Sequence, residues 1–172
     1  MSRAVLIVDG YNVIRQPGGP YARLFERDPD AARTRLVSDV AGYAYGEWIA
    51  TIVFDAGGNP HADGAPERVA GIDVVFSAHG SSADSVVERL ASEARASGRR
   101  VTVVSSDAQT QWSVMGSGVQ RMSARDFIDE VLGEDELRSE SNPSGSTKST
   151  LSERLDSATL DELTRWSRGH HR

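Results

Sequence analysis

The sequence contains no cysteine, and this absence excludes two classes of small protein. Neither a disulfide framework nor a zinc site built on cysteine thiolates can form. A length of 172 residues fits one α/β domain, with or without a tail, and allows a sizeable hydrophobic core.

Long hydrophobic runs are also missing from the start of the chain. The first apolar run covers only residues 4–8, which is too short for the core of a signal peptide or for a membrane span. We therefore expect a cytoplasmic protein with no membrane partner.

Positive charge is in deficit, because the formal net charge is −6 and Lys148 is the only lysine. A passive nucleic-acid coat would be basic over the whole domain, so the charge argues against one. An enzyme that acts on nucleic acid remains compatible, since it can gather carboxylates around metal ions and keep arginines at the rim. The scarcity of lysine fits codon bias as well as phosphate recognition.

Short apolar runs alternate with segments of helical periodicity. Strands are predicted at residues 4–8, 50–54, 72–76, 101–104 and 119–122, and the first two are predicted to be buried. Helices are predicted from Asp28-Pro29 to near Gly46, from Ser81 or Ser82 to Gly98, at 108–115 and at 123–132. Strands that are apolar throughout are typical of parallel sheets. The alternation predicts an α/β domain with a central parallel sheet flanked by helices.

The composition changes at Gly133, which suggests a division of the chain into three parts. Residues 1–133 form the predicted domain. Residues 134–150 are acidic and then rich in Ser, Asn, Gly and Thr, as in a flexible linker. Residues 151–172 form a predicted C-terminal helix and tail, which we expect to fold back onto the domain, although partner binding stays open.

Four aspartates follow the predicted strands. Asp9 and Asp55 end the first and second strands, Asp107 follows the fourth, and Asp84 lies in the first turn of the helix after the third. The C-terminal ends of parallel strands share one edge, so these carboxylates should converge there. Asp73 begins its strand and should face the opposite edge.

A converging set of carboxylates is costly unless a cation compensates it, because each raises the pKa of its neighbours. Oxygen ligands of this kind suit Mg²⁺ or Mn²⁺, and the reaction that the arrangement serves best is hydrolysis of a phosphodiester bond. Any one of these aspartates taken alone is also explained by a structural role at a strand end or helix cap. Four of them at one edge are less easily explained in that way.

The residues Val8–Asn12 resemble the opening signature of the NYN domain, in its YacP-like branch. Further segments of the same pattern follow in order, namely Ile52–Ala56, Gly71–Ser77, Ala83–Ser85, Ser105–Asp107 with Gln111-Trp112, Ser123–Arg125 and Arg165–Gly169. NYN domains are similar in fold to PIN-domain nucleases. The resemblance implies a metal-dependent endoribonuclease that cleaves single-stranded RNA, with mRNA or ribosome-associated RNA as substrate and the ribosome as a candidate partner.

The resemblance also implies roles for individual residues. Asp9, Asp55, Asp84 and Asp107 would ligate metal or support the attacking water, with Asp9, Asp84 and Asp107 as the metal ligands. Asn12 would orient a ligand at the same edge without adding charge. These residues form the predicted catalytic set.

Other polar residues are candidates for binding RNA or phosphate. Ser123 and Arg125 begin the last predicted helix of the domain, where a phosphate can bind. Capping of the helix is the favoured interpretation of Ser123, whereas the role of Arg125 stays open. Ser105 and Ser106 could contact phosphate or form a turn. Trp112 could stack on a base or pack in the core, and the same two roles are open for Tyr11.

Three other functions compete with a ribonuclease. A catalytically inactive RNA- or ribosome-binding module is disfavoured because clustered carboxylates repel phosphates. A phosphatase that uses Asp9 as nucleophile typically carries a second aspartate two positions later, where this chain has Tyr11. A DNA nuclease of related fold would need helical elements for duplex DNA that are not evident. The RNA target and the oligomeric state stay open.

Overall fold

The computed structural model describes residues 2–107, 116–140 and 156–169, with the side chains of residues 134–140 excepted. The predicted short helix at 108–115, with Gln111 and Trp112, lies outside the described residues. So do residues 141–150 of the predicted linker and residues 151–155 and 170–172 of the predicted C-terminal part.

The strands form one six-stranded sheet in the order β3-β4-β2-β1-β5-β6. Five strands are parallel, namely β1 (Ala4–Asp9), β2 (Trp48–Phe54), β4 (Ile72–Phe76), β5 (Val101–Val104) and β6 (Val119–Met122). The edge strand β3 (Pro66–Val69) is antiparallel to β4. The first strand of the chain therefore lies in the middle of the sheet, between β2 and β5.

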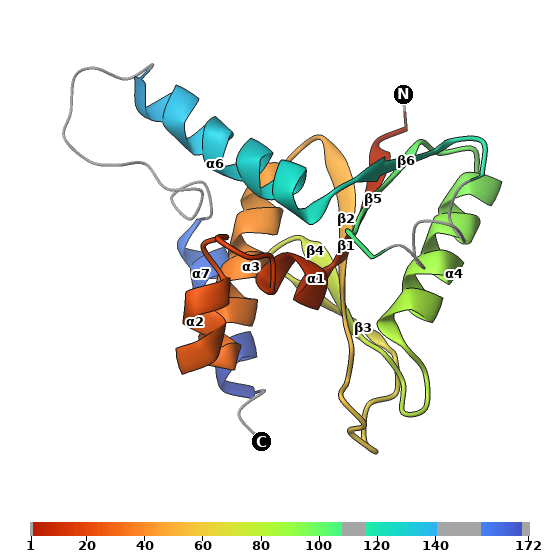
Figure 1. The fold of residues 1–172 in the computed structure, drawn as a ribbon, viewed down its shortest axis with the longest axis horizontal. Coiled ribbons are helices and arrows are strands. Elements are labelled where there is room, and N and C mark those ends of the chain that lie inside the picture. Colours follow the sequence, from red (N-terminus) through yellow and green to blue (C-terminus); the bar gives the residue numbers. More distant parts are fainter. Residues whose placement is uncertain (1, 108–115, 141–155, 170–172) are drawn as a thin grey trace.

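The helices cover both faces of the sheet. In Figure 1, α4 (Ala83–Ala96) covers one face, and the other face carries α1 (Gly10–Ile14), α2 (Ala22–Arg27), α3 (Pro29–Ala44), α6 (Ala124–Glu140) and α7 (Ser157–Gly169). The predicted α/β class, with a central parallel sheet flanked by helices, is confirmed.

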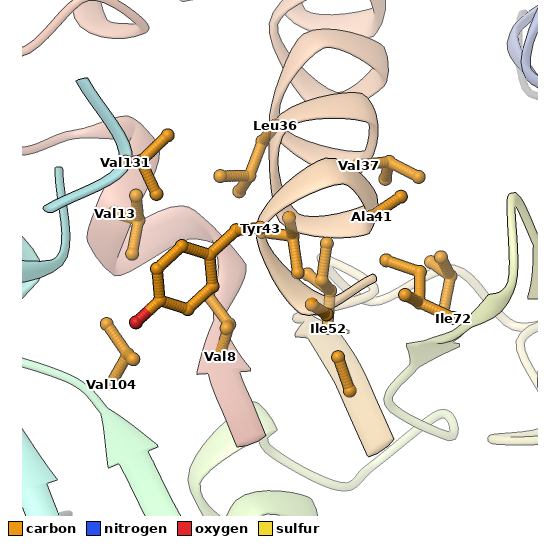
Figure 2. Packing of buried hydrophobic residues seen from close by; sticks show 14 of the residues in the cluster. Val8, Val13, Leu36, Val37, Ala41, Tyr43, Ile52, Ile72, Val104 and Val131 are labelled. Carbon is orange, nitrogen blue, oxygen red and sulfur yellow. The ribbon is translucent and has the colours of Figure 1, made fainter. Parts of the chain in front are cut away.

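Both faces of the central strand are buried, which explains its unbroken apolar run. Val5 and Ile7 belong to the core beneath α4, whereas Leu6 and Val8 belong to the larger core beneath α3. Figure 2 shows the larger core, to which Tyr43, Val8 and Val104 belong. The two cores fix the direction of β1 and therefore the place where Asp9 emerges from the sheet.

Polar caps set the helix starts as the sequence predicted. The carboxylate of Asp28 accepts a hydrogen bond from the backbone N–H of Ala31 (3.0 Å), and Pro29 occupies the first helical position. Ser82 caps α4 through the N–H of Ser85. Because Ser82 fixes the first turn of α4, it also fixes the position of Asp84.

The end of α6 differs from the prediction. The helix continues through Gly133 to Glu140, so the expected end at Leu132 was wrong. Glycine costs a helix about 1 kcal/mol but does not by itself stop it. The predicted linker therefore starts within a helix, and the division of the chain into domain, linker and tail stays a prediction.

The C-terminal helix α7 packs against α3 and β3. Its Leu163 and Trp166 are buried in the larger core, whereas Leu160 is exposed. The prediction that this helix folds back onto the domain is confirmed, although Leu160, one of the apolar residues on which it was based, stays exposed.

The hairpin between β3 and β4 was not predicted. Ala70 and Gly71 form its two-residue turn, and both have positive φ, at 52° and 83°. Such turns favour residues that tolerate the left-handed region, and alanine does so at a cost of about 1–2 kcal/mol. Ala70 therefore strains the turn that joins the two strands.

We expect Ala70→Gly to raise the free energy of unfolding by about 1 kcal/mol, because glycine adopts positive φ without a steric penalty. Urea unfolding measures the change. A matched control is Ala94→Gly inside α4, which should lower stability by about 1 kcal/mol. A loss of stability in both variants would contradict the strain at Ala70.

Candidate active site

Four aspartates reach one cleft at the C-terminal edge of the sheet. Asp9 is the last residue of β1, and Asp55 directly follows β2. Asp107 lies beyond the end of β5, and Asp84 is in the first turn of α4. All of them line a cleft of about 630 Å³, together with Asn12. The structure thus brings together the five residues of the predicted catalytic set, while their chemical roles stay a prediction.

Asp9 is the buried member of this set, with only 8% of its surface exposed. Burial, with smaller contributions from the charges of Asp84, Asp107 and Asp55, raises the pKa of its carboxyl group to about 6. The backbone N–H of Asn12 opposes this shift by donating to Oδ1 of Asp9 (3.3 Å). The carboxylates of Asp84, Asp107 and Asp55 therefore lie close enough to Asp9 to act on it electrostatically.

Gly10 allows β1 and β2 to end close together. A Cβ atom at this position would lie 2.4 Å from Cε1 of Phe54, which is fully buried. Phe54 cannot easily give way, because its ring packs against those of Tyr11 and Phe76, with centroids 5.2 and 5.4 Å away. Only glycine fits between the two strand ends that carry Asp9 and Asp55.

Asn12 joins two distant parts of the site. Its side-chain oxygen accepts a hydrogen bond from the backbone N–H of Ser106 (2.8 Å), which is 94 residues away in the sequence. The bond holds the loop that carries Asp107 against the helix that follows Asp9. Asn12 therefore positions carboxylates in addition to lining the cleft.

The two serines after β5 both accept hydrogen bonds from backbone N–H groups. The hydroxyl of Ser105 accepts from the N–H of Asp107 (3.2 Å), and that of Ser106 accepts from the N–H of Ala124 (3.0 Å). Ser77, which sequence reasoning did not single out, plays a similar part after β4, since its hydroxyl accepts from the N–H of Ala56 (3.1 Å). Its signal was its place at the end of the segment Gly71–Ser77.

Ser123 caps the start of α6. The hydroxyl of Ser123 accepts from the N–H of Asp126 (3.0 Å) and donates to Oδ2 of the same residue (2.7 Å). The residues that the structure shows lining the cleft do not include any of the four predicted phosphate contacts, Ser105, Ser106, Ser123 and Arg125. Their contact with RNA stays a prediction.

Sequence reasoning missed the basic residue of the cleft. Arg15 is the only cation among the described residues that line it. Its guanidinium carbon lies 5.2 Å from the ring centroid of Tyr11 and 5.6 Å from that of Phe25. These rings hold the cation at the mouth of the cleft. No sequence pattern separates Arg15 from the other arginines, because its role depends on a five-residue helix, α1.

The donor set of the cleft suits a hard cation such as Mg²⁺ or Mn²⁺. Within the described residues, however, no three acidic or histidine side chains come close enough to hold one ion directly. Mg²⁺ usually keeps several waters and binds through one or two carboxylates together with substrate phosphate. The carboxylates present fit an ion held in that way.

The comparison with protein families agrees with the geometry, because the YacP-like NYN domain matches residues 6–168. The chain belongs to this family. It is 31% identical to the uncharacterized protein YacP of Bacillus subtilis over 134 residues, which is 74% of each chain. The crystal structure of Rae1 (YacP) from Bacillus subtilis has 27% identity and a TM-score of 0.61, and the match covers 98% of this chain and 96% of that one.

The crystal structure of a Rae1 mutant, in which leucine replaces one tryptophan, matches equally well. It has 26% identity and a TM-score of 0.64 over 95% of this chain and 99% of that one. Membership of the YacP-like NYN family implies a PIN-like ribonuclease, generally metal-dependent, with RNA as substrate. In the part of the chain that the structure describes, we find no helix that is long and apolar enough to span a membrane.

Proposed function

We propose that the protein is a metal-dependent endoribonuclease that hydrolyses phosphodiester bonds of single-stranded RNA, with mRNA or ribosome-associated RNA as its substrate. The observation that carries the proposal is the convergence of four carboxylates in one open cleft, among them that of Asp9, whose pKa is raised by its burial and by its three neighbours. A fold retains such repulsion where a cation offsets it.

The proposed reaction assigns different roles to polar residues of the cleft. Asp9, Asp84 and Asp107 would hold Mg²⁺ or Mn²⁺, partly through waters that the ion keeps. The ion, when bound, would supply an activated water and neutralise charge on the phosphate. Asp55 would support the attacking water from the end of β2. Asn12 keeps Asp107 next to Asp9 through its bond to Ser106. Arg15 would bind a phosphate oxygen at the mouth, where aromatic rings hold its guanidinium.

Cleavage of a labelled, unstructured RNA by the purified protein tests the proposal, with Mn²⁺, with Mg²⁺ and with EDTA. We expect cutting with either metal and none in EDTA. Asp107→Asn keeps the shape of the side chain and removes its charge, and we expect it to lower the rate by about a hundredfold or more. A matched control is Asp73→Asn, because Asp73 pairs with Arg68 away from the cleft and its loss should leave the rate unchanged.

Failure of the wild-type protein to cut several RNAs with any metal would overturn the proposal. It would favour the inactive binding module, or an enzyme whose RNA a partner such as the ribosome must present. Equal losses in Asp107→Asn and Asp73→Asn would place the chemistry outside this cleft.

A further inference from the structure

A second cavity, of about 410 Å³, adjoins the cleft. The two share Tyr11, Asp55 and Ala56, so a chain bound in the first can reach directly into the second. The loop between β2 and β3, the strand β3 and the end of α7 complete the walls of the second cavity. This loop projects beyond the sheet at the lower end of the molecule in Figure 1.

The charges of the second cavity do not suit a phosphate. Asp55, Asp63 and Glu67 line it, and each brings a carboxylate. Arg33 also lines it, but its guanidinium forms an ion pair with Asp30 and donates to the hydroxyl of Tyr11 (3.0 Å). Because the acidic groups outnumber the one guanidinium, a neutral part of a nucleic-acid ligand is favoured there over its anionic phosphate.

The remaining walls suit a flat, polar group. Tyr11 and Phe76 provide aromatic surface, and Asn59 and His61 provide hydrogen-bonding side chains. The volume lies in the range of small-molecule pockets, which is about 300–1,000 Å³. A nucleobase meets these conditions, because it is neutral and planar and carries donors and acceptors on its edges.

The loop is fixed before any ligand arrives. The side-chain oxygen of Asn59 accepts from the N–H of His61 (2.9 Å), and Oδ1 of Asp63 accepts from the N–H of Ala65 (2.9 Å). The N–H of His79 donates to the carbonyl oxygen of Ala62 (3.0 Å), which ties the loop to the chain after β4. A pocket held in this way loses little freedom when it binds.

Carboxylates accept hydrogen bonds and reject groups that only accept. Guanine presents two adjacent donors, N1–H and the N2 amino group, on its Watson–Crick edge, and one carboxylate can accept both. Uracil presents a single N–H between two carbonyl oxygens, which carboxylates repel. From the charges and the walls we propose that the second cavity is a base pocket that selects guanine next to the phosphate cleaved in the first. This inference rests on the proposed function and names the specificity of the same site.

Binding can be measured without cleavage, so the test does not depend on the chemical step. The full chain with Asp9→Asn is titrated in EDTA against fluorescein-labelled pentanucleotides, UUGUU, UUAUU, UUCUU and UUUUU, by fluorescence anisotropy. We expect UUGUU to bind about tenfold more tightly than UUUUU, the size of one good bidentate contact. Adenine and cytosine, which offer one amino group each, should lie between them.

Two conservative substitutions test the carboxylates. Glu67→Gln and Asp63→Asn are each added to Asp9→Asn. Each replaces a carboxylate, whose two oxygens both accept hydrogen bonds, by an amide that has one accepting oxygen and one donating NH2 group. The amide oxygen of Asp63→Asn can still accept from the N–H of Ala65. We expect at least one of them to reduce the preference for guanine to less than about threefold, without weakening the binding of UUUUU, because the amide no longer repels the carbonyl oxygens of uracil. A matched control is Glu47→Gln, which makes the same change in the exposed segment before β2.

Equal binding of the four pentanucleotides, or binding of none, would overturn the base pocket. So would a preference for guanine that survives both substitutions. The test of the pocket is separate from the test of the proposed function. Cleavage without base preference would support the nuclease and overturn the pocket. Base preference without metal-dependent cleavage would support the pocket and overturn the nuclease.

Discussion

Asp9→Asn is expected to abolish RNA cleavage and, at the same time, to make the metal-free protein more stable at neutral pH. The activity should fall by at least about a thousandfold, because the variant removes the carboxylate at the centre of the acidic set. Asparagine keeps the oxygen that accepts from the N–H of Asn12, so the start of α1 is preserved.

The gain in stability follows from the pKa of Asp9, which burial raises from 3.8 to about 6 in the folded protein. A raised folded pKa favours the protonated form, so the wild type loses stability as the pH rises from about 4 to 6. Two pKa units correspond to roughly 3 kcal/mol. Urea unfolding in EDTA should therefore show Asp9→Asn more stable by about 2–3 kcal/mol at pH 7.5 and equal to the wild type near pH 4.

Two comparisons make this result specific. Asp73→Asn, which changes a half-buried carboxylate paired with Arg68, should not reproduce the pH-dependent gain. Mg²⁺ or Mn²⁺ should stabilise the wild type and not Asp9→Asn, because a bound ion favours the folded state only where its ligands remain. If the free energies of unfolding of the wild type and Asp9→Asn changed in parallel from pH 4 to 8, the pKa of Asp9 would not be raised in the folded protein.

Gly10→Ala should damage both the fold and the chemistry although it removes no functional group. The new Cβ atom would lie 2.4 Å from the ring of Phe54. Either β1 or Phe54 has to move, and overpacking of this kind costs about 1–3 kcal/mol. The displaced segments carry Asp9 and Asp55, so we expect cleavage to fall by about a hundredfold, the usual effect of a misplacement of about 1 Å. Urea unfolding and RNA cleavage measure the two effects.

A rescue experiment separates crowding from other causes. Phe54→Leu makes room for the added methyl group, so the double variant should recover part of the activity lost by Gly10→Ala. Gly133→Ala provides the matched control, because no atom lies within 4 Å of its Cβ position and alanine favours the helix by about 1 kcal/mol. Additive losses in the double variant would argue against the contact with Phe54.

The sheet and its acidic edge were predictable because both follow from periodic patterns. Apolar runs such as Val5–Val8 gave the parallel strands, and parallel strands bring their C-terminal ends to one edge. The strand β3 was missed because its residues are mostly exposed and include Pro66, so it carries no apolar run. The helix α1 was missed because five residues are too few to show a period.

The walls of the site were harder to predict than its carboxylates. Arg15 takes its place from contacts with Tyr11 and Phe25, which depend on how α1 and α2 pack. The roles of Ser105 and Ser106 were open in the sequence because a serine hydroxyl can hold backbone or phosphate, and the geometry shows that both hold backbone. The pKa of Asp9 depends on burial, which the order of residues alone does not specify.

The central place of β1 has a consequence for the newly synthesised chain. The strand β1 emerges from the ribosome before both of its neighbours, because it pairs on one side with β2 and on the other with β5, which is made much later. The bond between Asn12 and Ser106 closes the site across the same interval. A partly synthesised chain therefore holds Asp9 and Asp55 without Asp107 and its support. The order of synthesis delays the appearance of a complete cleft until most of the sheet has been translated.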